Sequence, residues 1–169
     1  MSPIIASFTR GEFSPAPEGL HQAVCIDVVD KGMQQTAWGE KHKVQVRWVI
    51  DAVDEKTGRQ HMVTSSYTLS LHKKALLRQH LEAWRGKRFT DEELKGFDLE
   101  RLIGVNCQLQ IVHSLGEENT VYSNVQAIVP LGKGMPQMAA PGDYVRVIDR
   151  ENQQQGRSAF SQQVEETPF

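Results

Sequence analysis

Long apolar runs are missing from this 169-residue sequence. No run approaches the roughly 18 residues that a membrane-spanning helix needs. Residues 1–19 lack a basic segment followed by an apolar stretch, so we expect no secretory signal and a cytoplasmic protein. Only two cysteines occur, Cys25 and Cys107, both in apolar alternating segments. We expect each to be a small buried core residue and no disulfide to join them.

Motifs typical of enzymes are also missing. The chain has neither the G-x-x-x-x-G-K-[ST] phosphate loop nor the G-x-S-x-G turn that presents a nucleophilic serine. Its six histidines never show H-x-x-x-H spacing and no C-x-x-C pair occurs, so no metal site is predicted. The acidic run at 91–93 fits the first turn of a helix, where the helix dipole favours acids. We therefore expect no enzyme, no cofactor and no metal.

The net charge of −2 hides an uneven distribution. Residues 31–88 contain 12 Lys and Arg against 5 Asp and Glu, a local charge of +7. Residues 89–149 contain 4 basic and 9 acidic residues, a local charge of −5. A polyanion responds to the local electric field of a surface rather than to the net charge of the chain. The basic middle of the sequence is therefore compatible with a nucleic-acid partner.

Hydrophobic periodicity predicts five strands and one helical block. Residues 41–52 alternate clearly, and DEKTGR at 54–59 is a turn, so the second and third strands form a hairpin. Leu77, Leu81 and Trp84 mark the apolar stripe of a helix, and Thr90 with Glu93 forms a capping box for a second helical piece. The expected strands are 20–30, 41–52, 61–71, 105–115 and 120–131, with a long loop at 31–41, helical pieces within 72–104, and a sixth strand or a docking segment at 144–148.

This order predicts a mainly β protein. Three strands, a helix block and two more strands is the order of the OB-fold, a five-stranded Greek-key barrel. We expect a flexible N-terminal arm at 1–19, the OB-fold domain at 20–131 and an extension with a short strand at 132–149. Residues 150–169 are polar and low in complexity, so we expect a disordered linker that ends in an acidic tip.

The second strand carries a ladder of basic and polar residues on the face opposite its apolar one. Lys41, Lys43, Gln45 and Arg47 alternate along it. Alternate residues of a strand are ~6.6 Å apart, close to the phosphate spacing of an extended nucleic-acid strand. These side chains are candidate phosphate ligands, and the alternative is an ordinary solvated sheet face.

Aromatic residues supply candidate stacking sites for bases. Trp38 lies in the expected loop beside the second strand, where it either stacks a base or folds back onto the barrel. Tyr67 and Tyr122 are further stacking candidates that also fit the core or its rim, whereas Trp48 and Trp84 are assigned to the core.

The predicted helix adds Lys73, Lys74 and Arg78 to the basic set. Lys74 and Arg78 are four residues apart with no acid between them, so they extend the basic surface or form the solvated side of the helix.

The last residues, VEETPF, suggest a family. A basic OB-like domain, a Gln- and Ser-rich linker and a tip with Glu165, Glu166, Pro168 and Phe169 resemble bacterial and phage single-stranded DNA-binding proteins. The stretches AVCIDVVDKGMQQTAWGEKHKVQVRW and FDLERLIGVNCQLQIVHS also look like phage- and prophage-encoded proteins of this class. In that family the acidic tip recruits replication, recombination and repair proteins. Two Glu and Thr167 stand here where the family has several Asp, and the tetramer of the cellular family is not carried over.

The resemblance implies sequence-independent binding of single-stranded DNA in phage or mobile-element replication and recombination, in the cytoplasm of a bacterial host. It also implies that partner proteins bind the tip. A homo-oligomer is compatible with it, and no membrane partner is expected. Two alternatives stay open: a strand-annealing or recombinase-loading accessory, and a protein–protein adaptor or inhibitor that binds no nucleic acid.

The acidic tip also yields a prediction about self-inhibition. Glu165 and Glu166 have the charge to compete with DNA for the basic middle of the chain. Deleting residues 164–169 should therefore raise the affinity for single-stranded DNA at low salt, measured by titrating full-length and truncated protein side by side. Equal affinities would contradict the competition.

Overall fold

The structure is a computed structural model that describes residues 14–152. Residues 1–13 of the predicted arm and residues 153–169 of the predicted linker and tip lie outside the described residues. Within the described part of the chain, no helix is long and apolar enough to cross a membrane.

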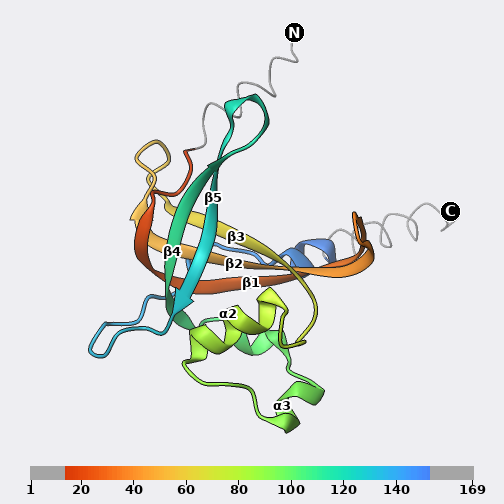
Figure 1. Ribbon diagram of the computed structural model, residues 1–169. Coiled ribbons are helices and arrows are strands. Elements are labelled where there is room, and N and C mark those ends of the chain that lie inside the picture. Colours follow the sequence, from red (N-terminus) through yellow and green to blue (C-terminus); the bar gives the residue numbers. More distant parts are fainter. Residues whose placement is uncertain (1–13, 153–169) are drawn as a thin grey trace, which may run out of the picture.

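One five-stranded antiparallel sheet, in the order β3-β2-β1-β4-β5, organises the protein (Figure 1). The mainly β class and the helical block between β3 and β4 are confirmed. In the described residues no ladder joins β3 to β5, so the sheet is open, although these two strands approach each other. The strands are β1 (Gly19–Thr36), β2 (Gly39–Val53), β3 (Gln60–Thr68), β4 (Asn106–Leu115) and β5 (Val121–Val129). The helices are α2 (Leu76–Arg85), α3 (Asp91–Lys95), η1 (Leu99–Leu102) and η2 (Glu117–Asn119).

The long loop expected at 31–41 is wrong, because these residues continue β1 and β2 as a hairpin. A bulge lies between Asp30 and Gly32, and Gly32 takes a left-handed φ of 68° while its N–H donates to Asp30 Oδ1 (2.8 Å). The bulge absorbs the glycine without ending the ladder. Pairing then resumes and runs to Thr36 opposite Gly39, so a two-residue turn replaces the loop.

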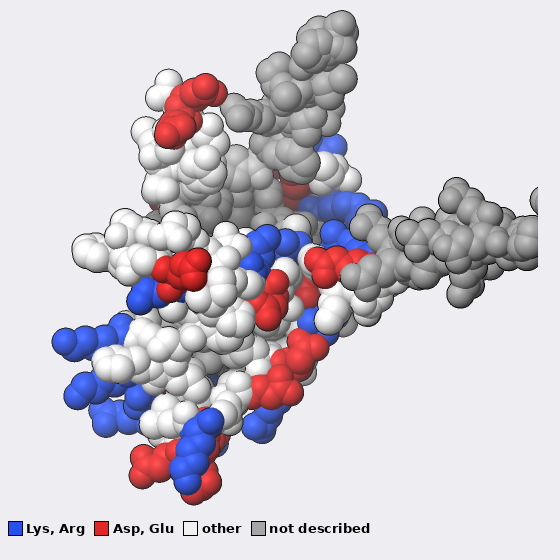
Figure 2. Space-filling model, turned by 90° about the vertical axis from the view of Figure 1, so that its right-hand side faces the viewer, with Lys and Arg blue, Asp and Glu red and all other residues white. Residues whose placement is uncertain are grey.

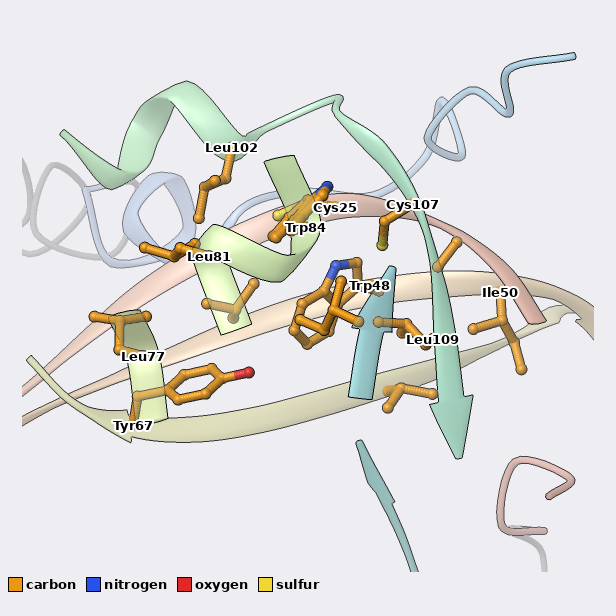
Figure 3. Packing of buried hydrophobic residues seen from close by; sticks show 14 of the residues in the cluster. Cys25, Trp48, Ile50, Tyr67, Leu77, Leu81, Trp84, Leu102, Cys107 and Leu109 are labelled. Atoms are coloured by element: carbon orange, nitrogen blue, oxygen red, sulfur yellow. The ribbon is translucent and has the colours of Figure 1, made fainter. Parts of the chain in front are cut away.

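Helix α2 covers one face of the sheet and closes the main core (Figure 3). Its predicted stripe of Leu77, Leu81 and Trp84 is buried there. Trp84 lies 5.7 Å from Trp48 between ring centroids, and its Nε1 donates to the carbonyl of Asn106 (3.0 Å). The helix ends at Gly86, whose φ of 74° lets it cap the C-terminus in the left-handed conformation.

Short structured pieces connect α2 to β4. The capping box predicted for Thr90 and Glu93 is confirmed at the start of α3. Cys25 and Cys107 are both free and buried in the core, as predicted.

The opposite face of the sheet, called here the outward face, is partly covered by the C-terminal segment (residues 132–152). Met138 and Tyr144 pack on Val24, Ile26 and Val49 of β1 and β2. The strand alternative for 144–148 is wrong, because residues 144–146 are irregular and residues 147–152 are helical. The docking alternative describes this segment better, since it lies on the sheet face rather than along a sheet edge.

Two leucines of β4 allow a test of how much core packing contributes to stability. Leu109 is fully buried, whereas Leu115 on the same strand is 73% exposed. Leu109→Ala should lower the free energy of unfolding by about 2–5 kcal/mol, through lost burial and the cavity left behind. The measurement is urea unfolding followed by circular dichroism.

Leu115→Ala is the matched control on the same strand and should change stability by less than about 0.5 kcal/mol. Equal effects of the two substitutions would contradict the placement of the core.

Candidate nucleic-acid interface

The outward face of β2 and β3 carries basic side chains on one strand and hydroxyls on the other. Inward-facing Val44, Val46 and Trp48 are buried, so strand alternation directs the intervening residues outward. The register pairs Lys43 with Thr68, Gln45 with Ser66 and Arg47 with Thr64.

Two bonds order this face: Lys43 Nζ donates to Thr68 Oγ1 (2.9 Å) and Arg47 Nη2 to Gln45 Oε1 (3.3 Å). We call Lys41, Lys43 and Arg47 the basic row. Both the basic row and the facing hydroxyls offer hydrogen-bond donors to an extended polyanion.

Trp38 lies in the turn of the β1–β2 hairpin and is 87% exposed. The alternative that it folds back onto the sheet is therefore wrong. The turn is held locally, because Trp38 N donates to Thr36 Oγ1 (3.1 Å) and that hydroxyl donates to the carbonyl of Gly39 (2.6 Å). An ordered turn thus presents an exposed indole ring three residues before Lys41 of the basic row.

The two tyrosines predicted for stacking do not join this surface. Tyr67 is only 3% exposed, and its hydroxyl hydrogen-bonds His80 Nδ1 (2.7 Å) inside the core, so it offers no face to a base. Tyr122 is 52% exposed near the tip of the β4–β5 hairpin, where a Cβ at Gly116 would collide with its ring. Figure 1 shows this hairpin and the Trp38 hairpin projecting in different directions.

The basic residues near α2 differ from the prediction. Lys73 and Lys74 are exposed, but they lie in a turn before the helix begins at Leu76. Lys74 and Arg78 are therefore not neighbours on one helix face. Arg78 also has an acidic partner within the helix, since its Nε lies 3.3 Å from Glu82 Oε2.

Charged side chains of both signs cover the face shown in Figure 2, which views the molecule from the right-hand side of Figure 1. Lys and Arg side chains lie at the left edge of that view, near its centre and at its upper right. Asp and Glu side chains run through the centre of the same view and also lie at its upper left and lower end. Basic and acidic side chains are therefore interspersed on this face of the folded chain.

The sequence interpretation missed a buried carboxylate that fixes the C-terminal segment. Asp27 is fully buried, yet its oxygens accept bonds from the Tyr144 hydroxyl (2.6 Å), Val147 N (3.0 Å) and Arg146 Nε (3.0 Å). Arg146 also donates through Nη1 and Nη2 to Glu100 of η1 (2.7 Å each). The one available signal was a lone acid within an apolar strand, between Ile26 and Val28.

Asp27 titrates differently from an ordinary aspartate. Burial by itself raises the pKa of its carboxyl, but the hydrogen bonds from Tyr144, Val147 and Arg146 outweigh burial and hold the pKa below its ordinary value of 3.8. A lowered pKa in the folded state means that Asp27 stabilises the fold above the ordinary pKa. That contribution is lost as pH falls through the lower, folded-state pKa.

The Asp27 contacts also bear on the basic row. Tyr144 lies beside Arg47, and Arg47 Nε is buried without a hydrogen-bond partner among the described residues. One end of the basic row therefore abuts the C-terminal segment, while Lys41 at the other end is exposed beside the Trp38 turn.

Residues 14–152 contain no group of three or more His, Cys, Asp or Glu side chains arranged to hold a metal ion. No family model matches the chain, and no curated protein matches it. Function is therefore inferred from the residues themselves.

The buried carboxylate gives a prediction for stability. Asp27→Asn should lower the free energy of unfolding at pH 7 by about 3 kcal/mol, because it removes the charge that Arg146 faces in a buried site. The deficit relative to the unsubstituted chain should shrink as pH falls below the ordinary pKa of 3.8 toward the lower pKa of the folded state, because Asp27 itself then becomes protonated. Urea unfolding at several pH values measures both effects.

Asp143→Asn is the matched control, because Asp143 pairs with Arg59 (2.7 Å) where both side chains are exposed. It should cost less than about 1 kcal/mol. An Asp27→Asn deficit that stays constant with pH would contradict the role given to the ionised carboxylate.

Proposed function

We propose that this protein binds single-stranded DNA without sequence preference, in the replication or recombination of a phage or mobile element. The observation that carries the proposal is the almost fully exposed Trp38, presented at the end of an ordered hairpin beside the basic row. An exposed indole is unfavourable in water unless it has a partner, and the flat face of a base is one.

Stacking on Trp38 supplies affinity without reading sequence. Every base has a π-face, and stacking on an aromatic side chain contributes about 1–3 kcal/mol per base. The basic row contributes phosphate contacts, which position a strand but carry no base information. The hydroxyls of Thr64, Ser66 and Thr68 extend the same face with neutral donors.

The sheet order and the helix block between β3 and β4 support an OB-type architecture. Single-stranded nucleic acid commonly binds such folds in a basic groove with stacking aromatics. The proposal keeps this fold assignment, with the sheet open between β3 and β5 in place of a closed barrel.

The C-terminal tip remains part of the proposal, although Glu165, Glu166, Pro168 and Phe169 lie outside the described residues. Phe169 carries a large apolar ring, which suits an apolar pocket with a basic rim on a replication partner. The two glutamates would meet the basic surround of that pocket.

A fluorescence titration with poly-dT tests the proposal. Trp48 and Trp84 are 0% and 5% exposed, so quenching on DNA binding should come from Trp38. Binding should also weaken steeply as salt rises. Trp38→Ala should reduce affinity about 5- to 150-fold, the equivalent of about 1–3 kcal/mol, measured by anisotropy of a labelled dT oligonucleotide.

Trp38→Phe should recover part of that loss, because it keeps an aromatic face. Leu115→Ala is the control for an exposed apolar residue at the other hairpin and should leave affinity unchanged. Absence of both quenching and salt dependence in the unsubstituted chain would overturn the proposed function.

A further inference from the structure

A groove of about 860 Å³ lies on the outward face between the β2–β3 turn and the C-terminal segment. Its lining includes the apolar residues Ile26, Val49 and Met62, of which Ile26 and Val49 are buried beneath the C-terminal segment and Met62 is 51% exposed. Tyr144 lines the side that belongs to the C-terminal segment. This volume lies within the range of small-molecule sites and exceeds what a single water or ion needs.

Two arginines stand at this groove. Arg59 comes from the β2–β3 turn, and its side chain is 72% exposed. Arg150 comes from the C-terminal segment, where its guanidinium lies 5.4 Å from the centroid of the Tyr144 ring and its Nε donates to the carbonyl of Val145 (2.8 Å). The acid in the lining is Asp143, which pairs with Arg59 (2.7 Å). The charged lining residues thus sum to +1.

The groove continues the face that carries the basic row. Val49 is the next outward residue of β2 after Arg47, and Met62 is the next outward residue of β3 after Thr64. Val49 and Met62 are paired in register and both line the groove. A strand that follows the basic row from Trp38 toward Arg47 is therefore led to this groove.

We infer that the groove is a nucleotide subsite at the far end of the DNA path from Trp38. This inference rests on the proposed function and adds a second anchoring point to it. The base lies against the exposed side chain of Met62, and the adjoining phosphate is held by Arg59 and Arg150.

The chemistry of the lining fits a nucleotide better than a purely apolar ligand. An unstacked base needs apolar contact for its faces, and a phosphate needs guanidinium groups, which bind it in a bidentate manner. The Arg59–Asp143 pair is exposed on both sides, so exchanging the carboxylate for a phosphate costs little. The apolar lining makes no hydrogen bonds to base edges, which agrees with binding that does not depend on sequence.

The subsite depends on the C-terminal segment, which supplies one side of it. That segment is held mainly by the contacts of Arg146 with Asp27 and Glu100, and the exposed Arg59–Asp143 pair adds one contact across the groove. Substituting Arg59 removes that exposed pair and substituting Met62 removes one lining side chain, whereas both leave the contacts of Asp27 and Glu100 in place.

The experiment compares variants in binding to a labelled dT20 oligonucleotide across a salt series. Arg59→Ala should flatten the slope of log K against log salt by about 0.7, the value for one lost phosphate contact on a single strand. Met62→Ala should weaken binding about fivefold and leave the slope unchanged, because it removes an apolar contact. Cross-linking with an oligonucleotide that contains 5-iodouracil should give an adduct on the peptide of Tyr144 or of Met62.

Lys95→Ala is the matched control, since Lys95 also forms an exposed ion pair, with Glu92 (3.2 Å), away from the groove. It should change neither slope nor affinity. If Arg59→Ala and Met62→Ala both behave like Lys95→Ala while Trp38→Ala still weakens binding, the subsite is overturned and the proposed function stands. If the unsubstituted chain does not bind dT20, both fall together.

Discussion

The unequal pairing of β1 with its two neighbours is the constraint on which the rest of the structure depends. β1 pairs with β2 from Ala23 to Thr36, but with β4 only from Gly19 to Val24. The second half of β1 therefore has one strand neighbour, and together with β2 it leaves the body of the sheet as a hairpin. Trp38 is exposed because the hairpin extends beyond β4. Lys41 lies on the extended part of β2, whereas Lys43 still pairs with Thr68 of β3.

The buried charge of Asp27 occurs where β1 loses β4. The pairing with β4 ends at Val24 opposite Asn106, and a bulge follows between Cys25 and Asp27. Asp27 pairs with Arg47 of β2 but has no residue of β4 opposite it, and the C-terminal segment supplies the donors for its carboxylate. Burying a carboxylate is unfavourable unless its oxygens are bonded, and Tyr144, Val147 and Arg146 satisfy that need.

Sequence reasoning found the parts of the fold in which periodicity and burial agree. The alternation of residues 41–52 and the stripe of Leu77, Leu81 and Trp84 locate a strand and a helix because each has one buried face. The 31–41 segment was missed because a hairpin exposed on both faces has no apolar alternation, and its glycines suggest a loop. The ladder to β2, a non-local interaction, decides its conformation.

The candidate site, like the fold, was predictable only where the alternation of the strands determines the direction of a side chain. The outward direction of Lys43 and Arg47 follows from the pleat, and the structure agrees. Tyr67 was misassigned although its spacing of four from Val63 puts both on the buried face of β3. The role of Tyr144 was not predictable, because it depends on a contact with Asp27, 117 residues earlier in the chain.

The two electrostatic systems of this face respond differently to salt. Contacts between the basic row and a DNA strand would be exposed and screened over about 8–10 Å at physiological ionic strength. The bonds to Asp27 are buried, and buried pairs are screened much less. Rising salt would thus release DNA while the C-terminal segment stays on the sheet, covering Ile26 and Val49. The C-terminal segment thus forms a fixed side of the proposed DNA path, because the buried hydrogen bonds to Asp27 that hold it are separate from the contacts that would bind DNA.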